Sequence, residues 1–141
     1  MEIRYQTFVD KNLLLLQYKG DFCIDKYEAQ VLDMIQKPEW ESINKVFLDL
    51  RFLMLDRNIN VNLIDSLIDI KANIVKKKHF SVQLVDDSLI TALAHLYQQE
   101  LSNIDLETEY CSTVKKAIEL LELNVNEDEF EATLKNLEHT F

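Results

Sequence analysis

Acidic side chains follow two of the apolar stretches in this sequence, and they are the residues best suited to chemistry. Asp49 and Asp56 follow one stretch, and Asp86 and Asp87 follow the next. If both stretches are parallel strands of one sheet, these carboxylates meet at one edge of it. Paired carboxylates can hold Mg²⁺ or shift each other's pKa, as a phospho-acceptor site of the response-regulator type requires. Acids at strand ends are also ordinary helix caps, which is the simpler interpretation.

Other polar residues stand beside these acids. Seven residues form the candidate interaction surface: Asp49, Arg51, Asp56, Arg57, Asp86, Asp87 and Ser88. No glycine, nucleophile or general base accompanies the charged segment 49–57, so we predict no catalytic residue and no enzyme activity.

The sequence contains one glycine and one proline in 141 residues. Phosphate-binding loops such as G-x-G-x-x-G and G-x-x-x-x-G-K-S/T each need at least two glycines, so these nucleotide-binding sites are excluded. The cysteines, Cys23 and Cys111, are far apart and are predicted to be reduced thiols. The three histidines have no metal-ligand spacing with them, so we predict neither a metal nor a cofactor.

The net charge of −10 is unevenly distributed, because residues 86–141 carry 13 acidic and three basic side chains, whereas residues 1–85 carry 12 of each. Such an acidic chain argues against nucleic acid and anionic membranes as partners. The basic run Lys76–Lys78 is explained by favourable placement at a helix end, with phosphate or lipid binding as the alternative. The N-terminus lacks the pattern of a signal peptide, and no apolar run is long enough to span a membrane, so a cytoplasmic location is expected.

The strand expected at Lys45–Leu50 organises the rest of the chain. Its apolar run Val46–Leu48 indicates burial on both faces, as in the centre of a sheet, with 52–55 as a connector. The segments 2–9 and 13–18 are separated by a short polar break, which predicts an antiparallel hairpin.

Helices and strands alternate after that hairpin. The predicted fold class is therefore α/β, with a mixed sheet of about five strands and four to five helices. Residues 1–123 form the predicted domain, and residues 124–141 add an amphipathic helix, expected over 126–141. The apolar face of this helix is expected to pack on the domain or on a second copy in a homodimer. It consists of Phe130, Leu134, Leu137 and Phe141.

This order of landmarks resembles the STAS or anti-anti-sigma-factor-like fold, and in particular small stand-alone bacterial proteins of that superfamily. The resemblance covers about residues 1–123. It depends on the hairpin and on four motifs, none of them specific by itself: G-D-F-x-x-D-x-Y at Gly20–Tyr27, P-E-W at Pro38–Trp40, D-L-R at Asp49–Arg51, and S-T-V-K-K-A-I-E-L-L at Ser112–Leu121.

The resemblance implies a non-catalytic regulatory or interaction module with a protein partner. Related anti-sigma antagonists carry a phospho-switch serine after the central strand, but the corresponding segment Asn58–Ser66 has no glycine and places Ser66 within a helix. We therefore predict a module without an evident phospho-switch. Binding of a small apolar ligand or lipid is the alternative function, with a pocket formed by Phe52, Met54, Trp40 and Tyr97.

Overall fold

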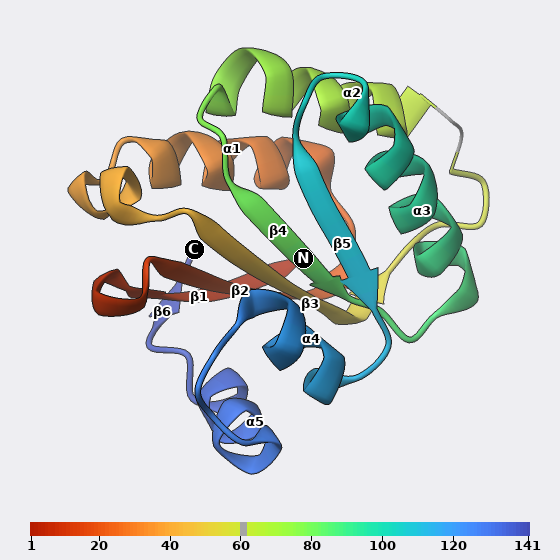
Figure 1. The fold of residues 1–141 in the computed structure, drawn as a ribbon. Helices are drawn as coiled ribbons and strands as arrows, with labels where there is room; N and C mark the ends of the chain where they lie inside the picture. The colour runs from red at the N-terminus through yellow and green to blue at the C-terminus, as the bar shows by residue number, and fades with distance from the viewer. Residues whose placement is uncertain (60–61) are drawn as a thin grey trace.

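A computed structural model describes residues 1–59 and 62–141, and these residues fold into layers of helices around a six-stranded sheet (Figure 1). The strands are β1 (Glu2–Phe8), β2 (Leu13–Asp21), β3 (Lys45–Met54), β4 (Phe80–Leu84), β5 (Glu107–Cys111) and β6 (His139–Thr140). Their spatial order is β5-β4-β3-β2-β1-β6. Strands β2 to β5 are parallel, and β1 is antiparallel to both of its neighbours. The predicted α/β class, a hairpin followed by parallel units, is confirmed.

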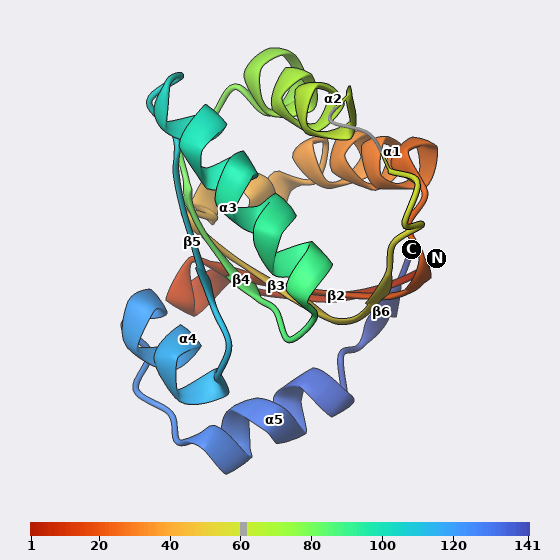
Figure 2. The ribbon, with the colours of Figure 1, turned by 90° about the vertical axis from the view of Figure 1, so that its right-hand side faces the viewer.

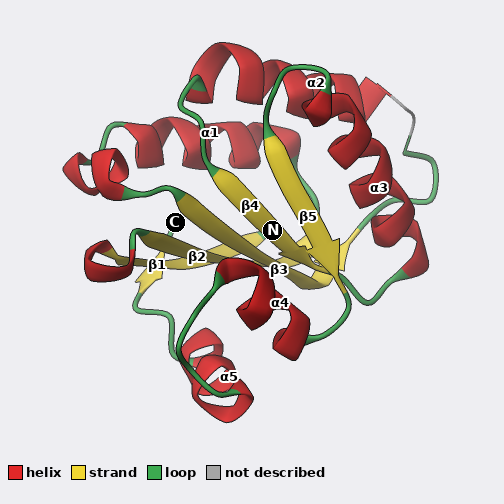
Figure 3. Ribbon diagram, viewed as in Figure 1, coloured by secondary structure: helices red, strands yellow, loops and turns green. Residues whose placement is uncertain are grey.

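Helices cover both faces of this sheet (Figures 2 and 3). On one face lie α1 (Ile24–Ile35), α2 (Asn62–Ile70) and α3 (Ser88–Ser102), and on the other lie α4 (Val114–Leu121) and α5 (Glu127–Lys135). Short helical turns complete the chain: η1 (Val9–Lys11), η2 (Pro38–Ser42) and η3 (Lys71–Val75).

The apolar alternation of the central strands builds a core on each face of the sheet. In β2, Leu14 and Leu16 belong to the core under α1 to α3, whereas Leu13 and Leu15 belong to the core under α4 and α5. Adjacent side chains of a strand point to opposite faces, so a continuous apolar run indicates burial on both. The same rule places Phe47 on the side of α4 and α5.

The central strand β3 is longer than predicted, because it continues through the expected connector 52–55 as far as Met54. Its partner β2 extends to Asp21 and offers backbone groups for this additional length, with Gly20 opposite Leu53 and Asp21 opposite Met54. The register shifts between Gln17 and Lys19, which marks a bulge.

The C-terminal helix is shorter than predicted and ends at Lys135 instead of continuing to Phe141. The chain leaves the helix at Asn136 and forms β6, in which His139 lies opposite Tyr5 of β1. The backbone N–H of Phe141 also donates to the carbonyl of Ile3 at 2.9 Å. These bonds cover the outer edge of β1, whose backbone groups would otherwise lack strand partners.

The helix before β4 also ends earlier than predicted. Helix α2 passes into the π turn η3, and Lys76 adopts a left-handed conformation with φ of 56°. Lys77 lies beyond this end, and its Nζ donates to the carbonyls of Trp40 and Glu41. The lysine run is therefore not the last turn of a helix. At its other end α2 is described from Asn62 onward, because residues 60 and 61 lie outside the described residues.

Candidate functional site

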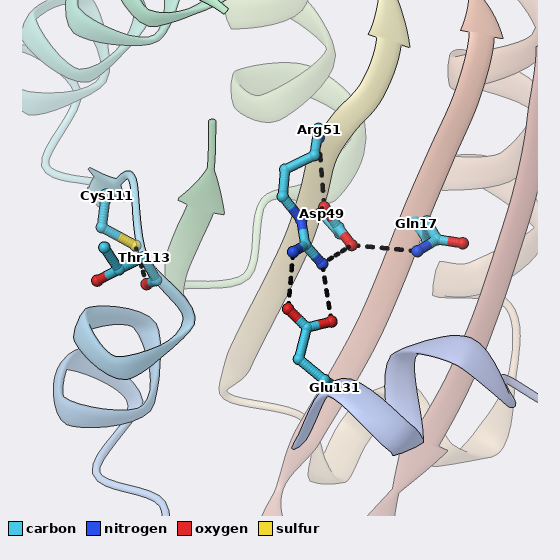
Figure 4. A network of polar contacts seen from close by, with 6 residues as sticks. All are labelled: Gln17, Asp49, Arg51, Cys111, Thr113 and Glu131. Carbon is cyan, nitrogen blue, oxygen red and sulfur yellow. Dashed lines mark hydrogen bonds and ion pairs between the residues drawn. The ribbon is translucent and has the colours of Figure 1, made fainter. Parts of the chain in front are cut away.

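Asp49 and Arg51 form an ion pair on the face of the sheet covered by α4 and α5 (Figure 4). Both side chains point to this face because they are two residues apart in β3. Arg51 donates to Asp49 Oδ1 from Nε at 2.9 Å and from its backbone N–H at 3.2 Å, and to Oδ2 from Nη2 at 2.8 Å. Gln17, opposite Asp49 in β2, donates to Oδ2 at 3.1 Å.

The guanidinium of Arg51 also connects the sheet to α5. Its Nη1 donates to Glu131 Oε1 at 2.7 Å, and its Nη2 donates to Glu131 Oε2 at 3.2 Å. The hydrogen bond to Asp49, together with the contact to Glu131, raises the pKa of Arg51 above its usual value despite partial burial. Arg51 is therefore a permanent cation held between two carboxylates, and it cannot act as a proton donor or acceptor.

The side chain of Asp49 is not available for chemistry or for contact with a partner. It is 0% exposed, and each carboxylate oxygen already accepts two hydrogen bonds. Since a carboxylate offers about four lone-pair sites, no site remains for Mg²⁺. The placement of Asp49 in an interaction surface was therefore wrong. Its position within β3, with Arg51 as an internal counter-charge, buries it.

The remaining charged candidates lie where the parallel strands β3 and β4 end, and their side chains are exposed. Asp56 and Arg57 follow β3, and Asp56 Oδ1 accepts from the backbone N–H of Asn58 at 2.9 Å. Asp87 caps α3, because its Oδ1 accepts from the backbone N–H of Leu89 at 2.9 Å and of Ile90 at 3.0 Å. Asp86 and Ser88, on either side of this cap, are exposed as well.

Two large apolar side chains at the end of β3 are exposed beside these charges. Phe52 is 48% exposed and Met54 is 55% exposed. The guanidinium carbon of Arg51 lies 5.6 Å from the centroid of the Phe52 ring, within cation–π distance. Both residues were predicted to line a pocket. The continuation of β3 instead turns them away from the core, and they form no part of the cavity described below.

The segment Asn58–Ser66, which was compared with a phospho-switch region on the basis of the family resemblance, is only partly described. Ser66 lies in α2 and is exposed, and its Oγ donates to the carbonyl of Asn62 one turn earlier. Asn60 and Val61 lie outside the described residues. Ser66 therefore satisfies its hydroxyl within its own helix.

The apolar residues of the C-terminal segment are covered by the same chain. Phe130, Leu134 and Leu137 are buried in the core with α4 and the sheet, and the Phe130 ring packs edge-on against Phe47 at 5.1 Å between centroids. Phe141 is half-buried against the opposite core. These side chains do not form one exposed face in the single chain.

The opposite face of the sheet contains a cavity of about 90 Å³ under α1, α2 and α3. A second hollow of about 40 Å³ adjoins it, since Tyr18, Tyr27, Leu48 and Lys71 line both. Tyr97 lines the larger space and Trp40 lines the smaller one, as predicted for a pocket.

Lys71, which lines this cavity, and its neighbour His79 were missed in the sequence. Burial lowers the pKa of Lys71 to about 8, and its Nζ lies 3.0 Å from His79 Nε2. Burial, followed by the charge of Lys71, lowers the pKa of His79 to about 4. The ring of His79 is therefore neutral at pH 7. Its Nδ1 donates to the Lys77 carbonyl, and its Nε2 accepts from Lys71.

Among the described residues, no cluster of three or more His, Cys, Asp or Glu side chains is arranged to hold a metal ion. Cys111 is buried and Cys23 is exposed, and both are free thiols. No helix in the described part of the chain is long and apolar enough to cross a membrane.

No protein-family model and no curated protein matches the sequence. A comparison with solved structures finds the anti-sigma factor antagonist SpoIIAA in its unphosphorylated form, with a TM-score of 0.49 and 9% sequence identity. The match covers 85% of this chain and 97% of that chain. At this TM-score and identity, we transfer neither a family nor a residue role from that protein to this chain.

Proposed function

We propose that this protein is a non-catalytic regulatory or protein-interaction module, and that its contact surface lies at the end of β3. This surface, the β3 exit, consists of Phe52, Met54, Asp56 and Arg57. Asp86, Asp87 and Ser88 at the end of β4 flank it.

The exposure of Phe52 and Met54 is the observation that carries this proposal. Exposure of a large aromatic ring and a thioether to water is unfavourable, and both residue types are enriched at the centres of protein interfaces. The stacking of Arg51 on Phe52 restrains the ring before any partner binds. A restrained aromatic side chain surrounded by charges is typical of an interface hot spot with a polar rim.

The ion pair of Asp49 and Arg51 supports a non-catalytic role. The carboxylate that was the best candidate for chemistry has all its acceptor sites occupied by Arg51 and Gln17. Asp49 instead joins β3 to β2 through Gln17, and its partner Arg51 joins β3 to α5 through Glu131. A rigid base of this kind suits the presentation of a contact surface from the same strand.

A capture experiment with matched variants tests the proposal. The tagged wild-type protein, a Phe52→Ser/Met54→Ser variant and a Leu96→Ser/Ile104→Ser control are incubated with native lysate of the source cells. The control removes comparably exposed apolar side chains, 41% and 39% exposed, from α3 and the turn after it. We expect specific proteins to be retained by the wild type and the control and lost from the β3-exit variant.

Equal capture by all three proteins would place the contact surface elsewhere. Turnover of a substrate by the pure protein, with no specific capture, would refute the module itself. Sedimentation of the same variants tests whether the partner is a second copy of this chain. If it is, the wild type and the control should sediment as dimers and the β3-exit variant as a monomer.

The cavity under α1 to α3 supports a second candidate function, the binding of a small apolar ligand. It is separate from the β3 exit, since neither Phe52 nor Met54 lines it.

A further inference from the structure

The cavity under α1, α2 and α3 is apolar on most of its wall but contains several polar groups. The apolar part includes Leu48, Leu50, Ile90 and Ala94. The polar groups are the side chains of Tyr18, Tyr27, Tyr97, Lys71, Ser81 and Gln83. A largely apolar cavity with a few convergent polar groups is typical of a site for a small organic molecule.

The amide of Gln83 is the first group that points to a ligand. Gln83 is only 7% exposed, yet its side chain makes no hydrogen bond with any described residue. The neighbouring Ser81, by contrast, donates to Thr108 Oγ1 at 2.7 Å. A buried amide without a partner is costly, unless a guest molecule or water inside the cavity supplies one. No fully buried side-chain polar atom of the described residues lacks a partner, so the unbonded Gln83 amide is accessible to solvent, and Gln83 lines the cavity.

The ammonium group of Lys71 is the second group that points to a ligand. Lys71 lines the cavity and its smaller neighbour, and its recorded polar contact is with the neutral ring of His79. Within the described residues no carboxylate lies within salt-bridge distance of Lys71, although the chain carries 25 acidic residues. Partly buried cations are normally paired, so an anionic group inside the cavity would complete this site.

The tyrosines provide the remaining polar surface. Tyr18 donates to Gln30 Oε1 at 3.2 Å, and a side-chain hydrogen bond links Tyr97 to Tyr27. Burial raises the pKa of all three hydroxyls, so they are neutral hydrogen-bonding groups that do not repel an anion.

We propose that this cavity binds a small amphipathic carboxylic acid, with its carboxylate at Lys71 and Gln83 and its apolar body against Leu50 and Ile90. The size limits the ligand, because about 90 Å³ is less than the ~150 Å³ of an engineered cavity that holds benzene. The ligand is therefore a short-chain acid whose chain also enters the adjoining hollow, and it is neither an aromatic acid nor a lipid with long acyl chains. This site and the β3 exit are independent, so either can fail without the other.

The test is titration calorimetry of the full chain with three probes of equal length: hexanoate, hexanol and hexylamine. We expect hexanoate to bind most tightly and hexylamine least, because only the carboxylate complements Lys71. In Lys71→Met, hexanoate affinity should fall about tenfold or more, whereas hexanol affinity should change by less than about twofold. Gln83→Leu should weaken hexanoate in the same direction.

Lys78→Met is the matched control, because Lys78 is an exposed lysine paired with Asp105. It should bind hexanoate as the wild type does. Urea unfolding of each variant establishes that it is folded. The proposal is refuted if the wild type shows no saturable binding of hexanoate, if Lys71→Met and Lys78→Met bind it equally, or if hexylamine binds as tightly.

Discussion

Replacing Arg51 by methionine should destabilise the protein severely, because it leaves the carboxylate of Asp49 buried without a counter-charge. The variant loses the bonds from Nε and Nη2, at 2.9 and 2.8 Å, and keeps those from the backbone N–H and from Gln17. Each hydrogen bond to a charged group contributes about 1.5–3 kcal/mol, and breaking a buried ion pair costs about 3–5 kcal/mol. We expect a loss of roughly 4 kcal/mol, from a domain stability of about 5–15 kcal/mol.

Urea unfolding followed by the fluorescence of Trp40 measures this loss. Trp40 is the single tryptophan and is buried, so its emission reports unfolding of the core. For a domain of this size the midpoint should fall by roughly 2 M urea. The matched control is Lys78→Met, which breaks the exposed ion pair with Asp105 and should unfold like the wild type.

A double variant separates charge from packing. In Asp49→Asn/Arg51→Met the buried carboxylate is gone, so this protein should be more stable than Arg51→Met alone. The reasoning is refuted if Arg51→Met unfolds at the same midpoint as Lys78→Met. It is also refuted if the double variant is no more stable than the single one, because the loss would then come from the packing of the Arg51 stem.

Three further predictions follow from the packing and the pKa values. Phe130→Ala should lose about 3–5 kcal/mol of unfolding free energy, because the ring is buried against Phe47; Leu96→Ala, at a half-exposed site on α3, should lose far less in the same urea titration. The pKa of His79 is lowered from 6.5 to about 4, so as the pH falls from 6.5 to 4 the unfolded chain protonates this imidazole before the folded chain does, and the free energy of unfolding should decrease. His79→Gln should show a shallower decrease, and an unchanged slope would contradict the assignment. Under native conditions a thiol reagent should label Cys23 rapidly and Cys111 slowly, because Cys111 is buried and burial raises its pKa. The rapid reaction should be absent in Cys23→Ser, and two equally fast thiols in the wild type would contradict this.

The sequence predicts the strand order along the chain well, because the continuous apolar runs and the short hairpin break are local signals. It predicts the role of Asp49 poorly. A charged residue after an apolar run was read as the exit of a strand, whereas β3 continues for several residues more. One local signal did point to burial: Asp49 and Arg51 have opposite charges and are two residues apart, so on a strand they share a face. Their third partner, Glu131, is 80 residues from Arg51 and could not be found from spacing.

The C-terminal segment and the cavity show two other limits of prediction. The spacing of Phe130, Leu134, Leu137 and Phe141 fits one helical face, but backbone pairing with β1 competes with the helix and draws the last residues into the sheet. A pattern of side chains does not report such long-range pairing. Ser81 and Gln83, in contrast, are polar residues on one face of β4, a strand that lies between two others. Polar residues at alternate positions of an inner strand indicate a polar site inside the protein, and this pattern can be seen in the sequence.

The pairing of β6 with β1 has a consequence for the order in which the protein folds. Tyr5 lies opposite His139, so one edge of the sheet is completed only by a segment that is synthesised long after β1. Until α5 arrives, Leu13, Leu15 and Phe47 lack the cover that Phe130 and Leu134 provide. The nascent chain thus exposes an apolar sheet face and an unpaired strand edge together, a combination that favours aggregation. Contacts of such sequence separation also slow folding, so this exposed state persists until α5 and β6 dock on the sheet.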